Sequence, residues 1–209
     1  MSTLITGGTG FIGAEVVRQL LARNAADDIH IAHRSGNFSR INDLVDHVHL
    51  IQADLADHDT IAAIIERTRP EVIYHLGAML SIPSEGNPQA AIEANGIGTY
   101  RLLEAARQNE VRQVLFASSI GVYGADIQED VISDVTIQRP ATIYGVTKVF
   151  GEQLGAYYKR KYGLDFRGLR YPSIIGPGVT TIGVAQFTRR CWRIELSGGE
   201  TRKCRFARG

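Results

Sequence analysis

The stretch Ser2-Thr3-Leu4-Ile5-Thr6-Gly7-Gly8-Thr9-Gly10-Phe11-Ile12-Gly13 decides the fold of this chain. A short apolar run enters a glycine-rich turn, and apolar residues at helical spacing follow the turn. Glycines permit a tight turn and a close backbone approach, and the N-terminus of a helix favours an anion. A turn that only joins a strand to a helix is the simpler alternative. The order of strand, turn and helix predicts instead that a dinucleotide is held by Gly7, Gly10, Phe11, Ile12 and Gly13.

The composition is that of an ordinary globular domain. The chain has 209 residues, 44% hydrophobic and 22% charged, with a formal net charge of +1. That balance gives no reason to expect a nucleic-acid partner, and no apolar run is long enough to predict a membrane span. Cys191 and Cys204 form no disulfide framework, and we see no signal peptide, so we expect a reducing, cytoplasmic setting.

Strand-like and helix-like segments alternate along most of the chain. This alternation predicts an α/β fold, a Rossmann-type doubly wound parallel sheet with strand order 3-2-1-4-5-6 and helices on both faces. Residues 81–88 are expected to form a loop, residues 184–196 a further helix, and residues 201–207 a short strand. The predicted strands are residues 2–6, 28–32, 48–51, 71–75, 111–117 and 165–170, and the main later helices are residues 57–67, 89–108 and 140–162.

The end of the second strand bears on the choice of cofactor. In dinucleotide-binding units an acidic residue about 20 positions past the glycines usually holds the ribose hydroxyls. This chain has His33-Arg34-Ser35 there. Arg34 could bind a 2′-phosphate that a carboxylate would repel, which favours NADP over NAD; a solvated loop arginine is the alternative. Further cofactor contacts are predicted at strand ends, at Asp54 and Leu55 and at Leu76-Gly77-Ala78, although Asp54 could equally serve a turn.

Tyr144-Gly145-Val146-Thr147-Lys148 is the candidate catalytic stretch. Residues four apart lie on one face of a helix, so the phenol and the ammonium point into the same space. We expect the ammonium to lower the pKa of Tyr144 and make it a usable acid or base. A half-buried tyrosine beside a solvated lysine is the alternative.

Two other polar groupings suggest functional hypotheses. Ser118 and Ser119 directly follow the fifth predicted strand, at the carboxyl end where open α/β sheets bind ligands. No nucleophile elbow surrounds them, which argues against a hydrolase. His47 and His49 are predicted to lie on one face of a strand; half-exposed histidines are commoner there than a metal pair, and we predict no metal site.

The residues above resemble the extended short-chain dehydrogenase/reductases, the NAD-dependent epimerase/dehydratase family. Four motifs occur in the family order over residues 1–178: the glycine turn, Leu76-Gly77-Ala78, the segment from Ser118 to Gly124, and the pair Tyr144 and Lys148. The resemblance implies catalytic roles for Ser119, Tyr144 and Lys148. Ser119 would orient a substrate hydroxyl, Tyr144 would take its proton, and Lys148 would bind the nicotinamide ribose. It also places Tyr171, Pro172 and Ser173 beside the nicotinamide.

The substrate implied by the resemblance is a secondary alcohol, with a nucleotide sugar as the first candidate. Residues 142–176 also resemble the short-chain-type L-threonine 3-dehydrogenases, which implies amino-alcohol oxidation as an alternative. Residues 179–209 are interpreted as the remnant of a C-terminal substrate lobe, and a cofactor-binding module without turnover is the second alternative. Seven basic residues in 189–209 are interpreted as a solvated tail; they could also hold a diphosphate or a nucleic acid. The family also implies a homodimer, or a higher homo-oligomer, through helices 89–108 and 140–162.

Overall fold

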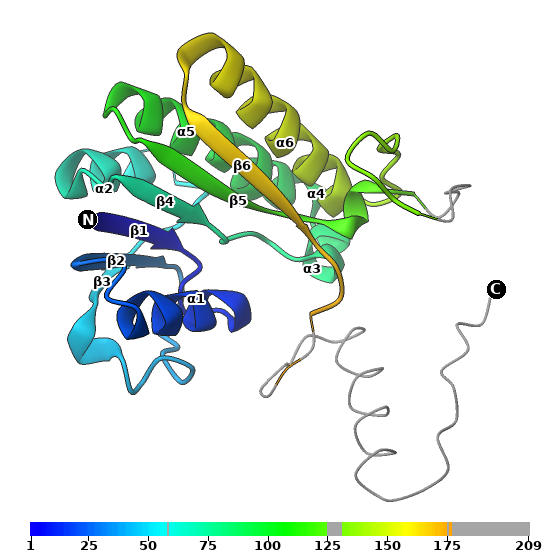
Figure 1. Ribbon diagram of the computed structural model, residues 1–209. Helices are drawn as coiled ribbons and strands as arrows, with labels where there is room; N and C mark the ends of the chain where they lie inside the picture. Colours follow the sequence, from blue (N-terminus) through cyan, green and yellow to red (C-terminus); the bar gives the residue numbers. More distant parts are fainter. Residues whose placement is uncertain (58, 125–130, 175, 177–209) are drawn as a thin grey trace, which may run out of the picture. The chain divides into compact units, whose positions relative to one another are not determined.

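The computed structural model describes residues 1–57, 59–124, 131–174 and 176. The chain divides into two units, Met1–Tyr171 and Pro172–Gly209, and the fold described below is that of the first unit (Figure 1). The predictions for residues 184–196 and 201–207, for both cysteines and for the basic tail lie outside the described residues.

Six parallel strands form one sheet in the order β3-β2-β1-β4-β5-β6, which confirms the predicted topology. The order reverses between β1 and β4, whose last residues Thr6 and His75 lie side by side. A crevice at such a reversal, beyond the carboxyl ends of the strands, is where doubly wound sheets bind ligands. The strands are β1 (Ser2–Thr6), β2 (Asp28–His33), β3 (His49–Gln52), β4 (Val72–His75), β5 (Gln113–Ser119) and β6 (Asp165–Tyr171).

Helices cover both faces of the sheet, as predicted (Figure 1). Helix α1 (Phe11–Ala22) packs on one face around fully buried Ile5, Val17 and Ile31. Three helices share the core of the other face, where Leu102, Leu103 and Phe116 are among the buried residues. They are α2 (Thr60–Thr68), α5 (Gly98–Gln108) and α6 (Ile143–Tyr162).

Glycines bring α6 directly onto β5 and β6. A Cβ atom on Gly151 would lie 2.6 Å from the Phe116 ring, and one on Gly155 would lie 2.2 Å from the Phe166 ring. No side chain fits at these separations, so both positions must stay glycine for the helix to pack this closely. Gly163 caps the C-terminal end of the helix in the left-handed region, with φ of 75°.

The structure corrects two local predictions. Residues 81–88 do not form a loop: α3 (Ser81–Gly86) is a short helix whose Ser84 hydroxyl donates to the Met79 carbonyl. His47 lies in the 3₁₀ turn η1 (Val45–His47) and His49 begins β3, so the two histidines do not share a strand. Both errors come from short segments in which tertiary contacts outweigh local sequence preference.

The predicted helix at 89–108 exists, with a change of pitch inside it. It runs from α4 (Pro88–Ala91) through a π-helical segment, η2 (Ile92–Ile97), into α5. Gly98 permits a close approach, since a Cβ atom there would lie 2.6 Å from the Leu55 carbonyl oxygen. Among the helices that the structure describes, none combines the length and the apolar character that a membrane span requires.

Candidate functional site

The glycine turn between β1 and α1 is built for backbone proximity. Gly7 has φ of +71°, a conformation that favours glycine, and a Cβ atom on it would lie 2.8 Å from Gly77. A Cβ atom on Gly13 would lie 2.2 Å from the Gly7 carbonyl oxygen. At the head of α1, the N-cap residue Gly10 offers no side-chain hydrogen bond to the first turn. Backbone without side chains beneath a helix N-terminus fits the pyrophosphate of a dinucleotide.

The other predicted cofactor residues lie at the ends of neighbouring strands. Buried His33 ends β2, and its Nδ1 donates to the Ser35 carbonyl at 3.1 Å, while Arg34 and Ser35 are exposed. The Asp54 carboxylate accepts from the Ala56 N–H at 2.9 Å, so it holds a turn, which is the alternative role predicted for it. Leu55 packs against Gly77.

Tyr144 and Ser119 meet around a glycine. A Cβ atom on Gly121 would lie 3.4 Å from Ser119 Oγ and 3.7 Å from the Tyr144 ring. Tyr144 is the second residue of α6, whose N-cap Thr142 accepts from the Gly145 N–H at 3.1 Å. A Cβ atom on Gly145 would lie 2.1 Å from the Gly121 carbonyl, so glycine at 145 lets the helix start approach this turn.

Lys148 is a buried side chain and not the solvated lysine of the alternative interpretation. It is 3% exposed, and its Nζ donates to the Ala117 carbonyl at 2.7 Å. The same atom lies 4.8 Å from the centre of the Phe116 ring and 5.6 Å from that of the Tyr144 ring. Burial lowers the pKa of Lys148 from 10.5 to about 8, although the Glu152 carboxylate raises it.

The expected lowering of the Tyr144 pKa by Lys148 is wrong. Burial raises the pKa of Tyr144, and the Ser119 side chain opposes the rise. The Lys148 ammonium, engaged with the Ala117 carbonyl, does not offset the desolvation of the phenol. Helical spacing places the two side chains on one side, but it does not reveal burial, which decides the direction here.

Asn95 is a buried residue whose role the sequence reasoning missed. Its side chain accepts from the Met79 N–H at 2.7 Å and donates to the Met79 carbonyl at 2.9 Å. It also donates to Thr147 Oγ1 at 3.3 Å, beside Lys148 in α6. The available signal is a polar amide between small residues in a helix, a pattern that is usually interpreted as close packing. The π-helical turn around it is a feature that often marks functional sites.

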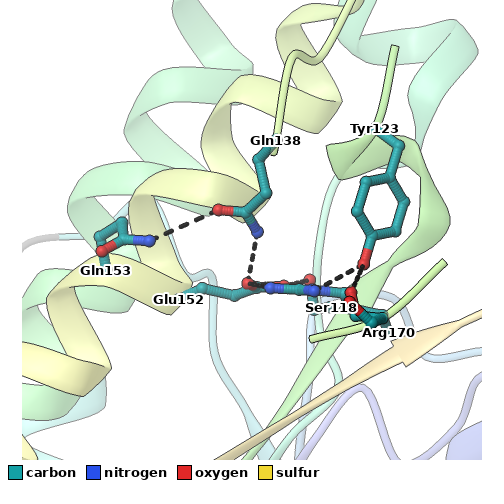
Figure 2. A network of polar contacts seen from close by, with 7 residues as sticks. Ser118, Tyr123, Gln138, Glu152, Gln153 and Arg170 are labelled. Atoms are coloured by element: carbon teal, nitrogen blue, oxygen red, sulfur yellow. Dashed lines mark hydrogen bonds and ion pairs between the residues drawn. The ribbon is translucent and has the colours of Figure 1, made fainter. Parts of the chain in front are cut away.

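A second group that sequence reasoning missed surrounds Glu152, one turn after Lys148 (Figure 2). Arg170 of β6 pairs with Glu152 at 2.7 Å and donates to the Tyr123 hydroxyl at 2.6 Å. Ser118 also donates to the Glu152 carboxylate, and Gln138 does so at 2.6 Å. Burial would raise the pKa of Glu152, but these partners lower it. The network ties α6, β5 and β6 together directly beside Ser119.

Of the three residues predicted beside the nicotinamide, Tyr171 lies in the first unit, and Pro172 and Ser173 lie in the second. Tyr171 ends β6 opposite Ser119 in the sheet register, and burial raises its pKa. Pro172 and Ser173 belong to the second unit, so their place beside a nicotinamide stays a prediction.

His49 stacks on His30, not on His47, and both rings contact Asp28. The described residues contain no cluster of three or more side chains able to hold a metal ion.

A family model and individual relatives of known name match most of this chain. The family model for the NAD-dependent epimerase/dehydratase family matches residues 3–197. Mitochondrial L-threonine 3-dehydrogenase from Sus scrofa is 36% identical over 194 residues, 88% of this chain and 50% of that protein. UDP-glucose 4-epimerase from Mycolicibacterium smegmatis is 35% identical over 191 residues, 85% of this chain and 57% of that protein.

Solved structures agree with these relatives. UDP-glucose 4-epimerase from Thermus thermophilus, complexed with NAD, superposes with a TM-score of 0.82 at 28% identity and covers 96% of this chain and 64% of its own. L-threonine dehydrogenase from Phytophthora infestans superposes with a TM-score of 0.81 at 34% identity, with coverage of 93% and 62%. The chain spans about half the length of the curated relatives it matches. The family model and the shared fold together place the chain in the NAD-dependent epimerase/dehydratase family.

Proposed function

We propose that this chain carries the cofactor-binding and catalytic residues of an oxidoreductase or epimerase that transfers hydride at a secondary alcohol carbon. The observation that carries the proposal is the meeting of Ser119 and Tyr144 around Gly121, with buried Lys148 behind the phenol ring. The nicotinamide cofactor would supply the hydride acceptor. Ser119 would hold the substrate oxygen and Tyr144 would take its proton. Lys148 would stabilise the phenolate form of Tyr144 that accepts this proton.

The relatives suggest two candidate substrates, which an activity screen distinguishes. A nucleotide sugar is our first candidate, since a UDP-glucose 4-epimerase is among the relatives. L-threonine is the second, favoured by the 36% identity to a threonine dehydrogenase. The protein is incubated with NAD or NADP and with UDP-glucose or L-threonine. Epimerisation is followed by proton NMR, and cofactor reduction by absorbance at the nicotinamide band.

The variant Tyr144→Phe is the matched control for this screen, because it removes one hydroxyl and keeps the ring. We expect turnover to fall by at least about a hundredfold, since proton transfer by a positioned group typically contributes a factor of roughly 10² to 10⁴. Cofactor affinity should not change. Full activity in Tyr144→Phe would contradict the assignment. Tight cofactor binding by the parent protein without turnover of any substrate would favour the alternative of a binding module.

We further propose that the cofactor is NADP. Exposed Arg34 follows the last residue of β2, and the carboxylate usual at this strand end is replaced by His33. A guanidinium there suits a 2′-phosphate, whereas a carboxylate would repel it. Calorimetric titration should give tighter binding of NADP than of NAD, and Arg34→Ala should remove the difference. Arg23→Ala, at the far end of α1, is the control. Tighter binding of NAD would contradict this choice.

We also propose a homodimer through the helices at 89–108 and 143–162. Large apolar or aromatic side chains on both helices remain 41–47% exposed: Ile92, Tyr100, Val146, Phe150 and Tyr157. A Cβ atom placed on Gly96 would lie 4.0 Å from the Ile92 side chain and 3.9 Å from the Phe150 side chain. Because both side chains lie close to this one position, the exposed surfaces of the two helices are continuous. Light scattering should report a dimer that Phe150→Glu dissociates, whereas Ile132→Glu, at an equally exposed site outside these helices, should not. A monomeric parent protein would contradict the proposal.

A further inference from the structure

Three buried side chains connect the glycine turn to the long helix. Thr6 ends β1, His75 ends β4, and Thr99 is the second residue of α5; each is at most 2% exposed. His75 Nδ1 lies 2.8 Å from Thr6 Oγ1, and His75 Nε2 lies 3.0 Å from Thr99 Oγ1. None of these contacts follows from a sequence motif, because the residues are 69 and 24 positions apart.

The donors and acceptors at the two ends fix the direction of every hydrogen bond in between. The Gly77 N–H donates to Thr6 Oγ1 at 3.0 Å, and the Thr99 hydroxyl donates to the Asn95 carbonyl at 2.5 Å. Thr99 has used its hydrogen, so it accepts from His75 Nε2–H. Neutral imidazole then has an acceptor at Nδ1, which takes the Thr6 hydroxyl hydrogen. Burial, with a smaller contribution from the Lys148 charge, lowers the pKa of His75 to about 3 and keeps the ring neutral.

Both ends of this hydrogen-bond chain are attached to the candidate site. Gly77 packs against Gly7, where a Cβ atom would come within 2.8 Å of the Gly77 backbone. At the other end, the Asn95 side chain holds the Met79 backbone and reaches Thr147 in α6. A displacement of Gly77 would therefore move the backbone that faces the glycine turn. The Thr6 hydroxyl is the direct restraint on the Gly77 N–H.

We propose that Thr6, His75 and Thr99 are positioning residues that fix the Gly77 backbone against the glycine turn and thereby set the affinity for the dinucleotide. None of the three needs to touch the cofactor. The inference rests on the proposed function, because it assumes that the turn holds a nicotinamide dinucleotide.

The test is Thr6→Val, which keeps the side-chain shape but leaves the Gly77 N–H and His75 Nδ1 without their partner. The matched control is Thr3→Val. Thr3 lies on the same strand, is 0% exposed, and its hydroxyl has no hydrogen-bond partner within the described part of the chain. We expect Thr6→Val to weaken binding of the preferred cofactor about tenfold in calorimetric titration, which corresponds to about 1.4 kcal/mol. Thr3→Val should bind as the parent protein does.

Hydrogen exchange of the Gly77 amide, measured by NMR, gives a readout that needs neither cofactor nor turnover. Thr6→Val should accelerate this exchange at least about tenfold, because the amide loses its acceptor. Thr6→Ser, which retains the hydroxyl, should restore both slow exchange and affinity. Should Thr6→Val fail to fold, Thr99→Val breaks the other end of the same chain and is compared with Thr3→Val in the same way.

Unchanged affinity and unchanged Gly77 exchange in Thr6→Val would overturn the inference, as would equal losses in Thr6→Val and Thr3→Val. A parent protein that binds neither NAD nor NADP would instead refute the proposed function. In that case the Gly77 exchange rates still decide whether the chain positions this backbone.

Discussion

The Nζ atom of Lys148 lies 5.6 Å from the centre of the Tyr144 ring and donates its hydrogen bond to the main chain of β5. In this arrangement the lysine is held as a buried cation beside an un-ionised phenol. Both groups carry a desolvation cost, which raises the pKa of Tyr144 and lowers that of Lys148. In the proposed function, these two groups would exchange stability for activity.

Lys148→Met should stabilise the fold while abolishing turnover. The folded-state pKa of Lys148, about 8, lies below its ordinary value of 10.5. The charged form is therefore disfavoured by folding at every pH below about 8, and this cost is relieved as the pH rises toward 10.5. This difference in pKa corresponds to about 3 kcal/mol of unfolding free energy at neutral pH. It is an upper value for the gain in Lys148→Met, because methionine forms no hydrogen bond to the Ala117 carbonyl. Denaturant unfolding at pH 7 measures the gain. Exposed Lys159→Met on the same helix is the control, and a less stable Lys148→Met would contradict the argument.

The stability of the folded chain should fall in acid through His75. Its folded-state pKa is about 3 and its ordinary value is 6.5, so between these values the unfolded chain binds the additional proton. The contribution of neutral His75 to the free energy of unfolding is fully present above pH 6.5. It is lost as the pH falls toward 3, by at most about 1.4 kcal/mol for each pH unit. Unfolding free energies measured across this range should show a smaller slope in His75→Asn. An equal slope in both proteins would show that His75 is not the group responsible.

Arg170→Gln should destabilise the protein more than Arg167→Gln, although both change an arginine of β6. The side chains of the Arg170–Glu152 pair are 22% and 12% exposed, whereas those of the Arg167–Asp165 pair are 65% and 31% exposed. Removing Arg170 leaves the largely buried Glu152 carboxylate without its cation, at a cost of about 3 kcal/mol. Loss of the exposed pair should cost less than about 1 kcal/mol. Thermal unfolding of the two variants gives the comparison, and equal shifts would contradict it.

Gly13→Ala should abolish cofactor binding, because its methyl group would lie 2.2 Å from the Gly7 carbonyl oxygen and force the turn apart. The control is Gly86→Ala, where an added Cβ meets nothing within 4 Å. Calorimetric titration should show no measurable binding in the first variant and parental affinity in the second. Retained affinity in Gly13→Ala would mean that the turn does not hold the dinucleotide.

The sequence by itself determined the order of the strands and the position of the glycine turn. Both are local: apolar periodicity marks each strand and helix, and glycines mark the positions where backbone must approach backbone. Short right-handed connections then leave few topologies, and the observed order is the predicted one. The candidate residues Ser119, Tyr144 and Lys148 also came from local spacing and from resemblance, and their catalytic roles stay predictions.

Only the tertiary structure decided the electrostatics and the long-range contacts. Helical spacing put Lys148 beside Tyr144, but burial, which depends on residues throughout the chain, reversed the expected pKa shift of the phenol. The partners of His75 and of Glu152 come from strands and helices far apart in sequence. No periodicity encodes such contacts, because each depends on how whole elements pack and on which polar atoms that packing removes from water.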